Sequence, residues 1–229
     1  MSFHFNVFIT RLVEIFPYLQ TTLLVAGASF LFSILLGGIS VAGMLGKNRV
    51  GRVLGKGYVK LMRCVPPIIL LFVVYYGLPI LIFRIAGKDI NGWDAIYFAI
   101  FALSLIHGAN MAEMMRGAYL SVEKGQLEAA VSIGLTPFQA FYRIVFPQAF
   151  VTALPVLGNT IISMLIDGAL AYSIGVIDVT GRASYLISMN LGGYVMETYL
   201  ALAVIYWILS FAVAKGFQIL EKRAVRVSR

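Results

Sequence analysis

Five apolar stretches, each long enough to cross a lipid bilayer, dominate this sequence. A bilayer core about 30 Å thick requires roughly 20 apolar residues in a spanning helix. The 229-residue chain is 60% hydrophobic and only 12% charged, whereas soluble domains are about one quarter charged. We therefore expect an all-α, polytopic membrane protein with a single transmembrane domain, residues 1–229. The predicted spans are residues 18–45, 64–86, 94–115, 148–170 and 195–217.

Basic residues are concentrated on one side of these spans. Most of the 18 Lys and Arg residues lie in segments 46–63 and 116–143 and after residue 214, which five spans place on the same side of the membrane. Because cytoplasmic segments are enriched in Lys and Arg, we expect the N-terminus outside and the C-terminus in the cytoplasm. The net charge of +8 follows from this asymmetry and does not favour nucleic-acid binding, since no base-stacking aromatics accompany it. The first apolar run also lacks the pattern of a cleavable signal peptide.

Segment 46–63 is basic and mildly amphipathic. We expect it to form a short helix at the cytoplasmic interface, held there by anionic membrane lipid. Its stretch GRVLGKG has only three residues between Gly51 and Gly55, and Gly57 follows Lys56 where a phosphate-binding loop requires Ser or Thr. Any use of ATP must therefore come from a partner chain.

The segment 123–146, between the third and fourth spans, has the pattern of a helix from a soluble protein. Leu127, Ala130, Val131 and Gly134 fall on one helical face. Gly134 is suited to the left-handed conformation that ends a helix. The pattern therefore predicts a helix that stops at this glycine.

A second short helix is predicted directly afterwards. Thr136 has the position of an N-cap and Pro137 that of the first helical residue, and Pro147 is expected to end this helix and begin the fourth span. Such a hairpin either lies on the bilayer surface or docks onto a cytoplasmic partner. Docking is favoured by the small side chains of its first helix, because small residues let another protein surface approach closely: Ala129, Ala130 and Gly134.

The hairpin sequence resembles the cytoplasmic signature of ABC importer permeases: Glu-Ala-Ala, three residues, Gly, nine residues, Ile, two residues, Pro. The flanking stretches RGAYLSVEKGQ and PQAFVTALPVLGN resemble the polar amino acid uptake branch, which includes histidine, glutamine, arginine and cystine permeases. In that family the first helix is a coupling helix that sits in a groove of an ATPase subunit. The resemblance therefore implies contact with the ATPase at Gly125, Gln126, Glu128, Ala129, Ala130, Gly134, Ile144 and Pro147.

The resemblance, which covers nearly the whole chain, also implies a set of partners. These are two copies of an ABC ATPase subunit, a second permease copy or a sister permease, an extracellular or periplasmic substrate-binding protein, and an amino acid substrate. The expected location is the cell (inner or plasma) membrane of a prokaryote. ATP hydrolysis belongs to the partner, so the chain itself is not expected to be an enzyme, and neither a cofactor nor a metal is expected.

Ionisable side chains within membrane spans are candidates for function. Asp167 lies at the end of the fourth apolar run, and an ionised Asp at mid-bilayer costs roughly 2.5–3.5 kcal/mol on insertion scales. His107 and Asn110 share one face of the third span. We hypothesise that Asp167, Asn110 and His107 line a substrate pathway in which the carboxylate binds an ammonium group. Alternatively, Asp167 reaches the outer interface or pairs with a cation, and His107 and Asn110 form hydrogen bonds between helices.

The residues near Asp167 differ from those usual in the family. Ile166, Gly168 and Ala169 stand where Lys, Thr and Ser are common, and Asn110 stands where Tyr is usual. The resemblance therefore implies a pocket that is less polar than in relatives. A polar amino acid such as cystine is compatible with this change.

Two functions of other classes stay open. An ion-gradient-driven secondary transporter of amino acids usually shows inverted repeats and paired broken helices, and here only the fourth span, with Pro155 and Gly158, contains such an interruption. A purely structural membrane anchor would need neither a docking hairpin nor polar residues within its spans. The permease interpretation is favoured over both.

Overall fold

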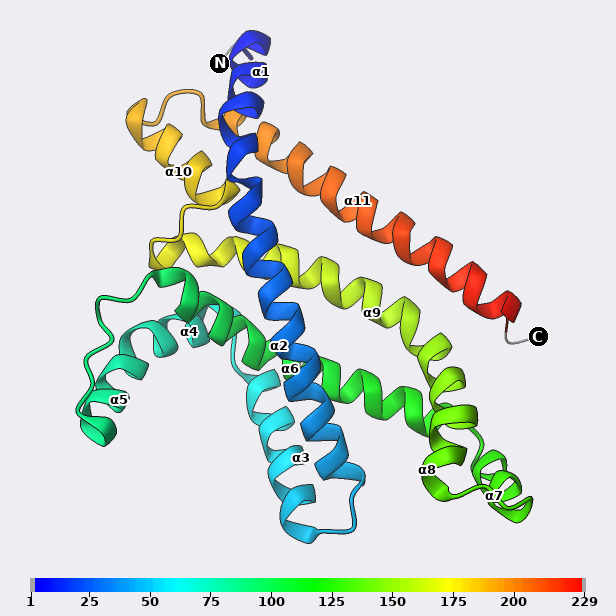
Figure 1. Cartoon of the computed structure of the whole chain (residues 1–229). Coiled ribbons are helices and arrows are strands. Elements are labelled where there is room, and N and C mark those ends of the chain that lie inside the picture. Colours follow the sequence, from blue (N-terminus) through cyan, green and yellow to red (C-terminus); the bar gives the residue numbers. More distant parts are fainter. Residues whose placement is uncertain (1–2, 228–229) are drawn as a thin grey trace.

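The computed structural model describes residues 3–227, which form helices and the turns that join them (Figure 1). This result confirms the predicted all-α membrane fold. The helices cross one another at open angles instead of forming a parallel bundle. Within the described residues, five helical segments are long and apolar enough to cross a membrane: Phe5–Leu45, Pro67–Ala86, Ala95–Ser121, Pro137–Ile174 and Val195–Ala224.

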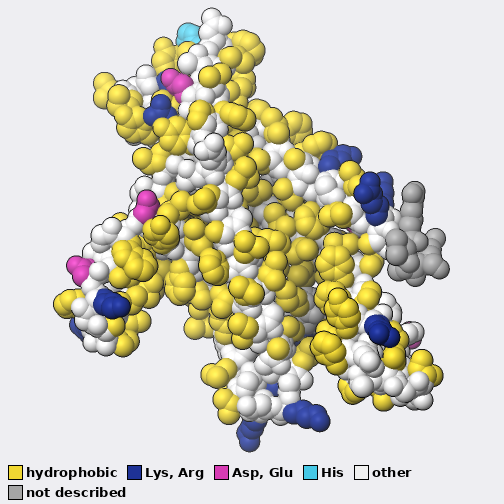
Figure 2. Space-filling model, viewed as in Figure 1, with side chains coloured by type: hydrophobic (Ala, Val, Ile, Leu, Met, Phe, Trp, Pro, Cys, Tyr) yellow, Lys and Arg dark blue, Asp and Glu magenta, His cyan; other side chains and the backbone are white. Residues whose placement is uncertain are grey.

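The surface of the protein is largely apolar, as Figure 2 shows for one face. Many large hydrophobic side chains on the spanning helices are more than half exposed, among them Leu31, Ile39 and Trp207. A soluble monomer rarely leaves continuous apolar patches of this extent in water. Lys and Arg side chains lie at the outer ends of the molecule: at the tip formed by α2 and α3, near α8, near the end of α11, and also near α5 and α10. This distribution is that of a protein surrounded by lipid.

An additional helix precedes the first predicted span. α1 (Phe5–Ile15) is joined to α2 (Leu19–Leu45) by a short 3-10 turn, η1 (Phe16–Tyr18). Two charged residues lower the hydropathy of α1, but the buried Arg11 donates to Glu14 Oε2 at 2.7 Å. The sequence analysis did not predict this helix, which packs against α11.

α6 (Ala95–Ser121) is the most enclosed of the spanning helices and packs along α2. Ser33 Oγ of α2 donates to the carbonyl oxygen of Ser104 on α6 at 3.3 Å. A Cβ atom built on Gly37 would lie only 2.7 Å from Met111 Cβ. The two helices therefore approach one another over small residues, as is common within membranes.

α3 (Arg49–Cys64) folds back antiparallel along the end of α2. Gly51 faces Gly43, and a Cβ on Gly55 would lie 2.9 Å from the carbonyl oxygen of Ser40. The sequence predicted an interfacial helix here. The close packing on α2 is an additional feature that the basic pattern did not indicate.

The second spanning segment is interrupted by a π-helical turn. It consists of α4 (Pro67–Phe72), η2 (Val73–Gly77) and α5 (Leu78–Ala86). Tyr75 in the π turn packs edge-to-face on Phe98 of α6, with ring centroids 5.4 Å apart. Apolar side chains of α4 and η2 form the largest hydrophobic core together with α6.

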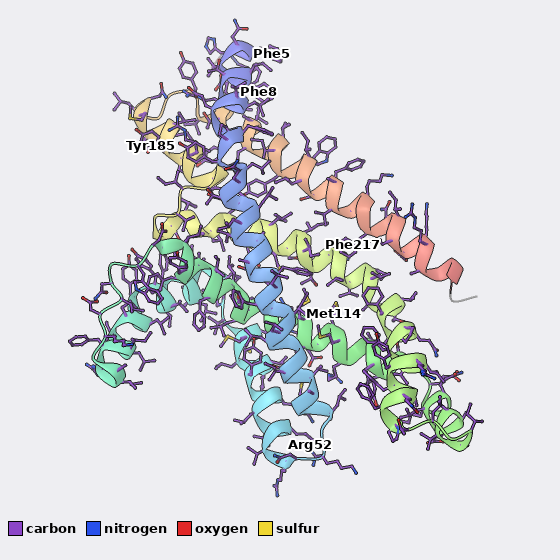
Figure 3. The ribbon with its side chains drawn as sticks, in the orientation of Figure 1. Phe5, Phe8, Arg52, Met114, Tyr185 and Phe217 are labelled. Atoms are coloured by element: carbon purple, nitrogen blue, oxygen red, sulfur yellow. The ribbon has the colours of Figure 1, made fainter. Side chains whose placement is uncertain are left out.

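The last two spans pack against each other. α9 (Phe146–Gly168) continues into η4 (Ala169–Ile174) and contacts α11 (Val195–Val227). A Cβ on Gly158 would lie 2.9 Å from the ring of Phe217, which lies between the two helices in Figure 3. The missing side chain of this glycine thus makes room for the aromatic ring.

Asp178 connects α2, α11 and the start of α10 (Val179–Met189). Its Oδ1 accepts from the backbone N–H of Gly181 at 2.8 Å, and its Oδ2 accepts from Thr22 Oγ1 at 3.4 Å and from the Tyr206 hydroxyl at 3.5 Å. The side chain is almost fully buried. Burial, partly offset by these hydrogen bonds, raises the pKa of Asp178 to about 6.

Replacing Gly37→Ala should destabilise the protein by about 1–3 kcal/mol, because the new methyl group would overlap α6. Gly38→Ala is the matched control, since a Cβ at that neighbouring position meets nothing within 4 Å. Thermal unfolding in detergent measures both effects. Equal unfolding temperatures for the two variants would contradict the proposed tight contact.

Replacing Asp178→Asn should change how stability depends on pH. The folded-state pKa of about 6 lies above the ordinary value of 3.8, so the stabilising contribution is complete below pH 3.8 and is lost as the pH rises through 6. A rise of this size corresponds to about 3 kcal/mol. Asparagine carries no charge and keeps an acceptor for Gly181, so the variant should be more stable than the original protein above pH 6 and should lose this advantage near about pH 4. Thermal unfolding across this range tests it, and parallel curves would refute it.

Candidate functional site

The predicted hairpin begins with α7 (Lys124–Ser132), which ends as the sequence indicated. Gly134 adopts a left-handed conformation with φ of 95°. Its N–H bonds the carbonyl oxygen of Val131, and the N–H of Leu135 bonds that of Ala130. This pair of bonds is a Schellman motif, which satisfies carbonyl groups at a helix end and needs a residue that tolerates positive φ.

The second helix, α8 (Pro137–Ala140), has the predicted cap at Thr136. The N–H of Gln139 bonds Thr136 Oγ1 at 3.3 Å, and the N–H of Thr136 bonds Gln139 Oε1 at 3.0 Å. This is a complete capping box. The sequence analysis did not predict that the Gln139 side chain accepts a hydrogen bond in this cap, although the Thr-x-x-Gln spacing could have indicated it.

One expectation about the hairpin was wrong: Pro147 does not end a helix. α8 continues through a π-helical turn, η3 (Phe141–Val145), into α9 without a break. The N–H of Phe146 bonds the carbonyl oxygen of Phe141, five residues earlier. Because the backbone already departs from the α-helical pattern here, the missing N–H of Pro147 is accommodated. A single continuous helix, which is bent between α8 and α9 in Figure 1, therefore runs from the hairpin deep into the spanning region.

The residues assigned to ATPase contact differ in exposure. Ala130 is only 2% exposed and packs inside the hairpin. Ile144 is half-buried. The others are exposed: Gly125, Gln126, Glu128, Ala129, Gly134 and Pro147.

A groove of about 250 Å³ lies where the end of α6, α7 and η3 meet. It is lined by Tyr119, Leu120, Val122, Glu123, Lys124, Leu127, Glu128 and Val145.

Large apolar side chains stand out from the same hairpin, with Ile133 80% and Phe138 77% exposed. The ring of Phe138 stacks on Tyr142, and Tyr142 on Phe146, with centroids 6.5 and 6.1 Å apart. The sequence interpretation missed this ladder, although its four-residue spacing was visible. Exposed apolar patches of this kind mark contacts with another protein or with lipid.

The second candidate site lies where α6 crosses α9. His107 Nε2 of α6 is 3.3 Å from Asp167 Oδ2 at the end of α9. The His107 ring is fully buried, and neither ring nitrogen makes a well-aligned hydrogen bond with another described residue. The Asp167 side chain is 28% exposed. Asp167 thus presents its carboxylate outward, while His107 lies behind it.

Asn110 is half-buried one turn further along α6. Among residues 3–227 its side-chain amide makes no hydrogen bond, so the structure brings together two of the three predicted pathway residues by direct contact. Further along α6, Glu113 and Arg116 form an ion pair, with Oε2 and Nη2 2.8 Å apart.

Both the sequence and the fold of this chain match known proteins. Residues 34–226 match the family of binding-protein-dependent transport system inner membrane components. The chain belongs to this family. Its fold also matches the crystal structure of an amino acid ABC transporter with histidines, with a TM-score of 0.84 and 26% identity over 97% of this chain and 100% of that one.

Two relatives in the family transport different amino acids. The L-cystine transport system permease protein TcyL of Bacillus subtilis is 39% identical over 206 residues, which cover 90% of this chain and 85% of the relative. The histidine/lysine/arginine/ornithine transport system permease protein HisQ of Escherichia coli is 35% identical over 161 residues, covering 69% and 71%. These matches establish a multi-pass inner-membrane permease of the ABC importer type.

Gly134→Ala should loosen the hairpin, because a left-handed conformation costs a non-glycine residue about 1–2 kcal/mol. We expect amide hydrogen exchange at Leu135 to become roughly 5- to 30-fold faster. Gly125→Ala is the control, since it lies in the same hairpin with ordinary φ and open space around its Cβ. Unchanged protection in Gly134→Ala would show that the motif does not hold the hairpin.

Proposed function

We propose that this chain is the translocation subunit of an ATP-driven amino acid importer, and that it couples substrate movement to a separate ATPase subunit. The observation that supports this best is the unbroken helix from Pro137 to Gly168. One of its ends belongs to the hairpin and the other bears Asp167. At about 1.5 Å per residue, this helix is long enough, about 45 Å, to transmit a displacement across a bilayer.

The hairpin is proposed as the contact with the ATPase. Its exposed Glu128, Ala129 and Gly134, together with the apolar Ile133 and Phe138, form a surface suited to a groove on another protein. Ala130 acts from inside by holding α7 to the rest of the hairpin. When two ATPase subunits close on ATP, the hairpins of two permease chains would be drawn together, and each α9 would move with its hairpin.

Asp167 is proposed as the group that meets the substrate. A carboxylate that remains partly exposed at the end of a spanning helix can bind an ammonium group. His107 contacts the same carboxylate from the buried side, and Asn110 adds a free amide on the same helix face. Ile166 and Gly168 supply no charge beside it. This composition favours a polar amino acid such as cystine over a strongly basic one.

The orientation follows the distribution of cations. With the hairpin, α3 and the end of α11 in the cytoplasm, the basic clusters all face inward, in agreement with the positive-inside rule. The N-terminus and α10 then face outward, where a substrate-binding protein would deliver its ligand. The partner permease is a second copy of this chain or a sister chain.

A reconstituted transport assay tests the proposal. The chain, affinity-purified from its native membrane in detergent, should bring down an ATPase, and the complex in liposomes should take up an amino acid only with ATP and the external binding protein. Asp167→Asn should lower uptake at least about tenfold at limiting substrate, since a charged contact contributes about 1.5–3 kcal/mol, while the ATPase remains bound. Asp89→Asn, a carboxylate in an exposed loop, is the control.

Two results would contradict the proposal. Uptake by the purified chain alone, driven by an ion gradient without ATP, would support a secondary transporter instead. Full coupled activity in a Gly134→Trp variant would show that the hairpin is not the coupling element.

A further inference from the structure

α3 has three distinct faces around its axis. One face, including Gly55 and Val59, is buried against α2 and α6. A second face is apolar but well exposed, with Val50, Leu54 and Leu61 each more than half accessible. The third face is exposed and cationic. Its members share one side of the helix because they recur every three or four residues: Arg49, Arg52, Lys56, Lys60 and Arg63.

The positive charge of α3 is not neutralised within the chain. Segment 46–66 contains no Asp or Glu. Among the described residues, none of the α3 cations forms a salt bridge, although Arg63 acts electrostatically on the Glu113 carboxylate of α6. Arg52 lies at the free end of the α2–α3 hairpin, away from the other helices (Figure 3). Cations without salt-bridge partners lie beside exposed apolar side chains on this helix. A binding partner for this surface must therefore offer both negative charge and an apolar region.

A bilayer surface fits both faces at once. The apolar face can enter the acyl region while the cations remain among phosphates. α3 is held beside the end of α2, because residues 46–48 join it to α2 and residues 65–66 join it to α4, and both neighbours belong to spanning segments. These links reach only about 10 Å or less. We propose that α3 binds anionic phospholipid headgroups, and that this binding makes the transport pathway respond to the charge of the membrane surface.

The route to the pathway runs through Tyr58. Its hydroxyl donates to the carbonyl oxygen of Leu105 on α6 at 2.6 Å, and it lies 2.7 Å from where a Cβ of Gly108 would be. Leu105 and Gly108 flank His107, which contacts Asp167. A displacement of α3 toward or away from the lipid headgroups therefore acts on the part of α6 that positions this pair. This step alone rests on the proposed function, since it assumes that Asp167 meets the substrate.

The surface suits lipid better than an acidic face of the ATPase. The ATPase contact is assigned to α7 and α8, which lie apart from α3 in Figure 1. A soluble protein surface would also have to cover Val50, Leu54 and Leu61, whereas lipid does so without further contacts. Each cation near an anionic surface contributes roughly a fivefold factor in affinity.

The test uses the assembled transporter in liposomes of phosphatidylcholine, with or without about 30% phosphatidylglycerol. We expect the anionic lipid to stimulate ATP-dependent uptake at least about threefold, and about 0.5 M salt to remove most of this stimulation. The triple variant Arg52→Gln, Lys56→Gln, Lys60→Gln should keep its activity in neutral liposomes and lose the stimulation. The matched control removes the same charge from α11: Lys215→Gln, Lys222→Gln, Arg223→Gln.

Tyr58→Phe separates lipid binding from its effect. It should retain bound phosphatidylglycerol, measured by mass spectrometry of the intact complex, but respond to it less than the original protein. Equal stimulation in the α3 triple variant and the original protein would overturn the inference, as would loss of the ATPase from the triple variant, which would identify α3 as a protein interface. A complex that shows no ATP-dependent uptake in either liposome would instead refute the proposed function.

Discussion

The close packing of α2 on α6 is the contact on which the rest of the fold depends. Gly37 allows the two backbones to meet where any side chain would collide with Met111, and Ser33 adds a hydrogen bond across the seam. α6 is thereby held at the centre, where it contacts α3, α4 and α9. Because lipid tails are as apolar as the helices, such contacts between small residues, and not hydrophobicity, hold spanning helices together.

Because α6 is central, two separate series of contacting helices reach it. One comes from the hairpin along the continuous helix of α8, η3 and α9, which places Asp167 beside His107. The other comes from the basic helix α3 through Tyr58. Both lead to the same few residues of α6, so the proposed ATPase contact and the proposed lipid-binding helix would act on one site without touching one another.

Much of the local structure could be predicted from the sequence because it depends on nearby residues. The stop at Gly134 and the cap at Thr136 each follow from the backbone preference of one residue and the hydrogen bonds of its neighbours. The helix break predicted at Pro147 is absent, because a π turn accommodates a proline that has no N–H to donate. No simple residue pattern predicts such a turn. The helix α1 was not predicted, because its packing against α11 joins residues far apart in the sequence. The burial of Ala130 likewise depends on which helix face turns inward.

The sequence by itself determined the all-α membrane fold, the family and the positions of the hairpin, since these rest on composition, hydrophobic run length and short motifs. Only the tertiary structure decided which small residues form the central seam, that one helix joins the hairpin to Asp167, and that His107 lies against that carboxylate. The physical reason is distance along the chain. Hydropathy and caps are local properties, whereas the contact between residues sixty positions apart depends on how two helices cross, and the apolar pattern of a membrane helix leaves that crossing unspecified.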